Sequence, residues 1–424
     1  MQTGTDRYKW QSVVLFVVIL IGLAFYLGLA GVILISGAFA LGSPQSAGGT
    51  PVGTNFIVAC GLGFCGLAML PAAFFSLQRM RGKPIRPFQI RPIKVWQGIA
   101  LGVGWIGAVL LSDFLYQNLA LGWLAAAPFY VLSIGLPLAM LVWIGLGGVH
   151  LGSRNRFWGS LGIGMTVGPF LASLLELFVY LGVLLVLLFV LAFNSNWLAT
   201  IQQLISQLQG VTSIDEVMQV LAPYLVNPFI LVSLLLVLGV FTPLIEETVK
   251  PAVVWLLAKR LQSPAQGFAL GIISGAGFAL VESLLASSTP GQGWGQLLAA
   301  RAGGGLMHIF ASGMMGWGIA SAWQGNRLRL LGTYVISVMI HGLWNSAAII
   351  IEIGSLQPYL NNNPVIKSLD SISIAGTAVL GLLVLIILPA LILVNRKMRQ
   401  PAPAIPASTA QSDIIAPSHN SWKD

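Results

Sequence analysis

Residues 234–257 have the sequence LLLVLGVFTPLIEETVKPAVVWLL, an apolar run that is interrupted by Glu246, Glu247 and Lys250. About 20 consecutive apolar residues cross the hydrocarbon core of a bilayer as a helix. A charged side chain near the bilayer centre costs roughly 2.5–3.5 kcal/mol on insertion scales. Three ionisable residues in one such run therefore indicate a polar site that is buried inside a helix bundle.

The composition extends this interpretation to the whole chain. Of its 424 residues, 56% are hydrophobic and only 8% are charged, whereas about 25% of the residues of a soluble domain are charged. The apolar runs lack the alternation of polar and apolar residues that is typical of barrel strands. The sequence thus predicts an all-α fold, a polytopic transmembrane helix bundle.

Ten candidate spans account for the apolar runs, and the basic residues orient them. The spans cover residues 12–41, 56–77, 96–118, 127–149, 160–193, 227–257, 265–287, 297–323, 331–352 and 373–395. With a cytoplasmic N-terminus, 18 of the 21 lysines and arginines fall in cytoplasmic segments. Because cytoplasmic loops carry an excess of basic residues, both termini are predicted to be cytoplasmic. This topology explains the net charge of +9 without nucleic-acid binding.

The spans divide the chain into five parts. Residues 1–193 form an accessory region of five spans, 227–352 a polar four-span core, 353–399 the last span, and 400–424 a Pro-, Ala- and Ser-rich cytoplasmic tail that we expect to be disordered. Residues 194–226 form an outside loop with helical apolar spacing and a capping box at Ser213 to Glu216. We expect an interfacial helix pair there; the alternative is a lid over the core.

Four successive spans of the core carry the polar positions. These are Glu246, Glu247 and Lys250; Phe278 and Glu282; Arg301 and His308; and His341 and Asn345. Helical residues three and four apart share a face, so both glutamates reach Lys250. One lysine needs only one carboxylate partner, which leaves the second carboxylate for chemistry. Glu176 lies deep in the fifth span, where it either faces the bundle and pairs with a cation or is protonated.

Two kinds of chemistry fit these residue types. Glu246 or Glu247 can act as a general base on water, while His308, His341 and Asn345 can polarise a carbonyl or hold an oxyanion. Alternatively, His308 and His341 with Glu282 or Glu246 are candidate zinc ligands with one open position. No H-E-x-x-H pair is present, and the spacing leaves both alternatives open.

The ordered motifs resemble those of the PrsW family of intramembrane proteases. The family pattern is E-E-x-x-K, then F-x-x-x-E, then two histidine motifs. In this sequence the corresponding residues are Glu246–Lys250, Phe278–Glu282, His308 and His341. The resemblance covers roughly residues 243–346. It implies peptide-bond hydrolysis in or near the membrane and a superfamily shared with the CAAX prenyl proteases. It also implies membrane-anchored protein substrates such as anti-sigma factors, and it leaves the use of a metal open.

Two other functional classes compete with the protease. A non-catalytic scaffold could retain the polar motifs for helix packing, as the gamma-secretase scaffold of the same superfamily suggests. A proton-coupled transporter also uses buried glutamate and histidine, although such proteins often contain internal repeats and no convincing repeat is found here. With both ends cytoplasmic and no removable targeting peptide, the expected location is a bacterial cytoplasmic membrane.

Overall fold

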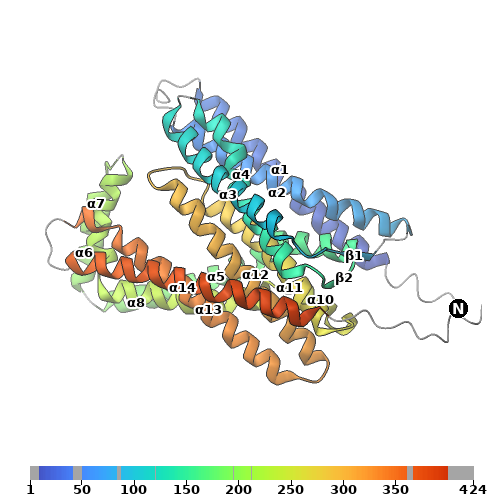
Figure 1. The fold of residues 1–424 in the computed structure, drawn as a ribbon. Coiled ribbons are helices and arrows are strands. Elements are labelled where there is room, and N and C mark those ends of the chain that lie inside the picture. Colours follow the sequence, from blue (N-terminus) through green and yellow to red (C-terminus); the bar gives the residue numbers. More distant parts are fainter. Residues whose placement is uncertain are drawn as a thin grey trace, which may run out of the picture.

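The computed structural model describes residues 9–41, 50–83, 87–119, 121–193, 195–211, 213–360 and 366–399, and nearly all of them are helical. The first half contains α1 (Lys9–Leu41), α2 (Thr50–Met80), α3 (Val95–Asn118), α4 (Gly122–Leu146) and α5 (Arg154–Ala192). The second half contains α8 (Pro228–Leu236), α9 (Thr242–Val249), α10 (Ala252–Leu257), α11 (Pro264–Ala286), α12 (Trp294–Trp323), α13 (Arg327–Gly354) and α14 (Ile366–Met398). The predicted all-α membrane bundle is confirmed (Figure 1). The predicted tail, 400–424, lies outside the described residues.

Nine helical segments of the described chain are long and apolar enough to cross a membrane. They correspond to all the predicted spans except 297–323, which is α12. Helix α12 has 30 residues, but it is rich in glycine and carries Arg301 and His308. It packs against α3, α4, α11, α13 and α14. Its neighbours are therefore other helices of the protein. Helix α12 is long enough to cross the membrane, but it is less apolar than the nine segments.

Helix α11 is the central column of the bundle. Most of its residues are buried, and it contacts α2, α4, α5 and α12. Figure 1 shows α11 and α12 between α1–α4 on one side and α13–α14 on the other. A Cβ atom added to Gly267 or Gly271 would collide with the backbone of α12, at Gly316 or Ser312. The sequence predicts this close approach, because small residues recur every four positions at Gly267, Gly271 and Gly275.

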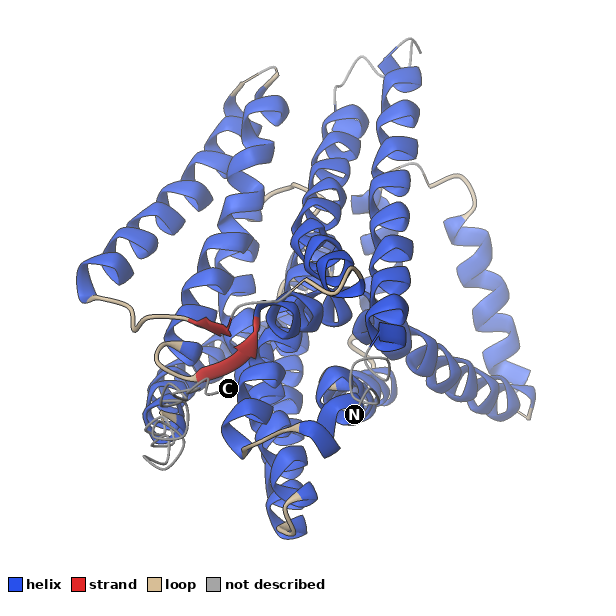
Figure 2. Ribbon diagram, turned by 90° about the vertical axis from the view of Figure 1, so that its right-hand side faces the viewer, coloured by secondary structure: helices blue, strands red, loops and turns tan. Residues whose placement is uncertain are grey.

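The loops that the sequence assigns to the cytoplasm lie together at one end of the bundle. A short antiparallel ribbon, which the sequence does not predict, pairs β1 (Pro87–Gln89) with β2 (His150–Ser153) at this end (Figure 2). The side chains of Arg329 and Lys397 approach the ring of Trp317 within 5.1 and 5.3 Å. Segments far apart in the sequence thus meet here, and the side of the membrane that this end faces stays a prediction.

The 194–226 segment forms two amphipathic helices, α6 (Ser195–Leu208) and α7 (Ile214–Leu225). The Ser213 side chain accepts a hydrogen bond from the Glu216 backbone N–H at 3.2 Å, so the predicted helix start is confirmed. Helix α7 packs through Ala222 against Ile353 and Leu356 at the end of α13. The structure therefore attaches this segment to the core, and its role as an interfacial pair or as a lid stays a prediction.

Replacing Gly271 with alanine tests the contact between α11 and α12. The added methyl group would meet the Ser312 carbonyl oxygen, and overpacking costs about 1–3 kcal/mol. We expect a lower Tm for thermal unfolding of the purified protein in detergent. Gly332→Ala on α13 is the matched control, because its added Cβ meets nothing within 4 Å. Equal Tm values for the two variants would contradict the backbone contact.

Candidate active site

The segment that carries the paired glutamates is a broken helix. A π-helical turn, Val237–Phe241, separates α8 from α9, and π-helical turns inside helices are frequent at functional sites. Pro243 occupies the first turn of α9, a position where proline is tolerated. The Asn345 side chain donates a hydrogen bond to the Leu238 carbonyl at 2.9 Å. Asn345 therefore fixes the irregular turn, and its side-chain hydrogen bond is with the backbone rather than with the ionisable cluster.

Lys250, which is completely buried, lies at the centre of the cluster. Its Nζ atom is 2.7 Å from Glu246 Oε2 and 2.9 Å from Glu247 Oε1. The same atom is 2.6 Å from His308 Nδ1 and stands 4.7 Å from the centre of the Phe278 ring. One ammonium group thus connects α9 with α11 and α12.

Each histidine of the cluster is held by its own carboxylate. His341 Nδ1 lies 2.9 Å from Glu247 Oε1, and His308 Nε2 lies 2.6 Å from Glu282 Oε2. Arg301 lies 2.9 Å from the other oxygen of Glu282. A carboxylate on one ring nitrogen sets the tautomer and the orientation of an imidazole. The two rings stand nearly perpendicular, with centroids 5.1 Å apart.

Glu246 is less tightly held than Glu247. The Glu247 side chain has no exposed surface, whereas 11% of the Glu246 side chain is exposed. Glu247 Oε1 lies 2.9 Å from both Lys250 Nζ and His341 Nδ1, whereas Glu246 Oε2 lies 2.7 Å from Lys250 Nζ and 3.7 Å from His341 Nε2. Of the paired glutamates, Glu246 is therefore the one whose carboxylate is available to a further group.

Helix α5 is the fifth helix to contribute to the cluster, through Glu176, which the sequence did not assign to the site. The Glu176 carboxyl group lies close to that of Glu246. Its Oε1 atom is buried and has no hydrogen-bond partner among the described residues. Tyr180, one helical turn later, lies 3.4 Å from Thr242 Oγ1 of α9. The only sequence signal was a carboxylate inside an apolar span, since Glu176 is 70 residues away from Glu246.

The structure thus brings most of the predicted positions into one place and separates one from the rest. Glu246, Glu247, Lys250, Phe278, Glu282, Arg301, His308 and His341 form a continuous set of contacts. Asn345 lies beside them on α13 but contacts the π-helical turn. The Glu282 side chain is 35% exposed, so the cluster is most accessible from this residue.

The donor set is suited to a metal ion. One ligand atom each of Glu246, His308 and His341 lie within 4.8 Å of one another, and two imidazoles with one carboxylate is a ligand set of catalytic zinc sites. Glu247 and Glu282 would be the supporting carboxylates behind the two imidazoles. Lys250 is the group that would have to move, because its Nζ atom contacts His308 Nδ1. Glu282, the other candidate ligand from the sequence, lies outside this set of three.

Comparison with known proteins agrees with the motif order. No curated protein and no solved structure matches the chain significantly. The family match extends from α5 to the start of α14, so it includes Glu176 and is wider than the resemblance over 243–346. Residues 158–368, which build the whole polar cluster, match the model of the PrsW family of intramembrane metalloproteases.

Proposed function

We propose that the protein is an intramembrane protease that hydrolyses peptide bonds of membrane-anchored proteins with a water activated by a buried glutamate. The observation that supports this most directly is the convergence of four core helices and α5 on one cluster of glutamates, histidines and Lys250. Charged groups inside a membrane are costly and mark functional sites. A packing role would need one ion pair, whereas here three carboxylates contact two imidazoles and Lys250.

In this mechanism the adjacent carboxyl groups of Glu246 and Glu176 receive the proton of the attacking water. The water oxygen then bonds to the carbonyl carbon of the substrate, and the carbonyl π electrons move to its oxygen. The electrons of the oxyanion then reform the carbonyl as the C–N bond breaks, and the same carboxyl pair delivers the proton to the leaving amine nitrogen, so that one water is consumed for each peptide bond. Glu246 suits this role because it is the less fixed of the paired glutamates.

The developing negative charge needs fixed donors. Lys250 and the imidazoles of His308 and His341 are preorganised for this task, because Glu247 and Glu282 hold them in place. Fixed donors in a dry site stabilise an oxyanion without reorganisation. Glu247, Glu282 and Arg301 are therefore positioning residues, and Phe278 covers both His308 and Lys250.

A zinc ion at Glu246, His308 and His341 would add Lewis-acid polarisation of the carbonyl and a more nucleophilic bound water. If Glu246 held the metal, Glu176, the other member of the carboxyl pair, would be the group that accepts a proton. The substrate that we propose is a membrane-anchored regulatory protein of the anti-sigma-factor kind, in a bacterial cytoplasmic membrane. The kinship with CAAX prenyl proteases stays a prediction.

Replacing Glu246 with glutamine should remove proteolysis. We expect cleavage of a membrane-anchored reporter library in liposomes to fall about 100- to 10,000-fold, the usual contribution of a general base. The matched control is Glu352→Gln, on the exposed surface of α13. Equal elution on gel filtration would verify that both variants fold. Normal cleavage by a correctly inserted Glu246→Gln variant would exclude the mechanism.

Replacing Glu176 with glutamine separates proton transfer from packing. The amide keeps the shape of the carboxyl group but cannot take up the proton, so kcat should fall at least about tenfold with an unchanged KM. Tm should stay at the value of the wild type, because only one side-chain atom is exchanged. If kcat is also unchanged, Glu176 is a bystander and Glu246 acts alone.

The metal content of the purified protein tests the donor set. We expect about one zinc ion per chain, measured by plasma mass spectrometry, as is typical of catalytic zinc sites. His308→Ala should lose this zinc, whereas the control His150→Ala, which is exposed on β2, should retain it. Cleavage that persists in chelator by a metal-free wild-type protein would instead assign the reaction to the glutamates without metal.

A further inference from the structure

The ammonium group of Lys250 lies among the same side chains that are suited to hold a metal ion. Its Nζ atom is 2.7 Å from Glu246 Oε2, 2.6 Å from His308 Nδ1 and 3.4 Å from His341 Nδ1. One ligand atom each of these three residues lies within 4.8 Å of the other two. Zinc binds nitrogen and oxygen ligands at about 2.0–2.2 Å, so an ion would use the same side chains at shorter distances. The positions of the ammonium group and of a metal ion therefore overlap.

Lys250 is held in this position by all of its donors. An ammonium group has three N–H donors and no acceptor, and the nearest atoms of Glu246, Glu247 and His308 lie 2.7, 2.9 and 2.6 Å from Nζ. The Lys250 side chain has no exposed surface. A second cation at the same ligands would be buried beside this charge, and like charges repel strongly where water is excluded. Lys250 in this position and a zinc ion thus exclude one another.

The Lys250 side chain has other partners within the cluster. Glu247 Oε1, 2.9 Å from Nζ, belongs to none of the three candidate ligand residues, and the centre of the Phe278 ring is 4.7 Å away. A carboxylate and an aromatic face both stabilise an ammonium group. The backbone is fixed, because Ser274 donates a hydrogen bond to the Lys250 carbonyl at 2.6 Å. An exchange of cations therefore needs only a rotation of the flexible four-carbon stem.

We propose that Lys250 is a built-in cation that competes with zinc for the three ligand residues, and that zinc binding requires the ammonium group to shift to Glu247. The carboxylates of the cluster then have a cationic partner in both states, since one cation replaces another. Lys250 thereby sets the metal affinity of the site. The inference rests on the zinc site of the proposed function and concerns the regulation of that site.

The test measures the zinc affinity of the full-length protein in detergent, with a chromophoric chelator as competitor. Lys250→Met keeps the unbranched shape of the side chain and removes its charge, so the affinity should rise at least about 10-fold. The matched control is Lys259→Met, because Lys259 is exposed and contacts the Trp323 ring; its affinity should equal that of the wild type. Adding His308→Ala to Lys250→Met should abolish the gain, which assigns the ion to the three ligand residues.

A second measurement uses the wild-type protein, because Lys250→Met leaves two buried carboxylates without their cation. The lysine Cε atoms are labelled with ¹³C, and the signal that is lost in Lys250→Arg is assigned to Lys250. Nuclear Overhauser contacts from the Lys250 Cε protons to the His308 ring should disappear at saturating zinc, whereas those to the Phe278 ring should remain.

Three results would overturn the proposal: equal zinc affinity of Lys250→Met and the wild type, no zinc binding by either protein, or a contact between Lys250 and His308 that persists at saturating zinc. None of these readouts depends on cleavage. A wild-type protein that shows the exchange of cations but cleaves no reporter would keep this inference and remove the protease.

Discussion

The rest of the core depends on the neutralisation of one buried ammonium group. Removing the Lys250 charge from water costs several kcal/mol, and the structure offsets this cost with Glu246 and Glu247 at 2.7 and 2.9 Å. Removing one partner of such a pair typically costs about 3–5 kcal/mol, because the other charge is left buried. The four helices around Lys250 are thus held in one arrangement by electrostatics as well as by packing.

Two backbone features make this arrangement possible. A π-helical turn at Val237–Phe241 precedes α9, and Glu246 of α9 lies close to His308 of α12 and His341 of α13. The Lys250 carbonyl, which stands before Pro251, accepts a hydrogen bond from Ser274 of α11 at 2.6 Å. Irregular backbone at membrane depth requires such partners, since no water is available there. The helix breaks expose backbone carbonyls, and the hydrogen bonds to these carbonyls attach α9 to its neighbours.

The sequence predicts the parts that depend on the cost of burial. An ionisable residue in an apolar run has few explanations, so Glu246, Lys250, Glu282 and His308 were recognisable as one site before their contacts were known. The glycines of α11 likewise predicted a close helix approach. The bilayer supplies a strong physical rule in both cases.

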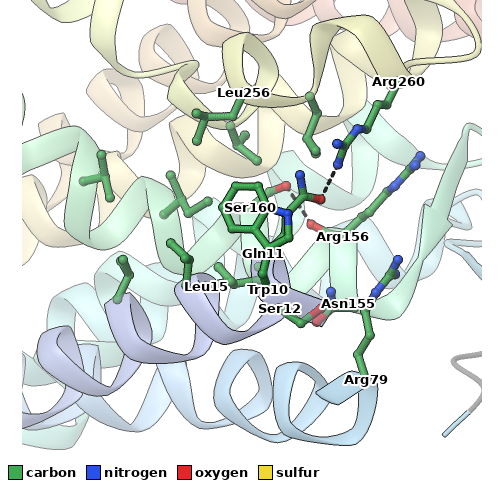
Figure 3. A pocket seen from close by; sticks show the side chains of 17 residues that line it. Trp10, Gln11, Ser12, Leu15, Arg79, Asn155, Arg156, Ser160, Leu256 and Arg260 are labelled. Carbon is green, nitrogen blue, oxygen red and sulfur yellow. Dashed lines mark hydrogen bonds between the residues drawn. The ribbon is translucent and has the colours of Figure 1, made fainter. Parts of the chain in front are cut away.

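The parts that depend on distant contacts were not predictable from one sequence. Glu176 joins the site only because α5 packs against α9 and α11, and nothing local specifies that packing. The β1–β2 ribbon has three and four residues, too few for a recognisable strand pattern. Arg79, Arg156 and Arg260, which line one cavity (Figure 3), have ordinary positions at the basic ends of their helices, where topology alone explains each of them. Their common location emerges only from the tertiary structure.

The polar character of α12 has a consequence for biogenesis. A segment with Arg301 and His308 and many glycines enters a bilayer poorly as an isolated helix, because its partition from the translocon to lipid is less favourable than that of its neighbours. Its stable surroundings are α11 and α13, which precede and follow it along the chain. During synthesis, α12 would thus insert into the bilayer only after α13 is made, or together with α11 as a helical hairpin. The polar residues that form the cluster therefore also make membrane insertion of α12 depend on its neighbouring helices.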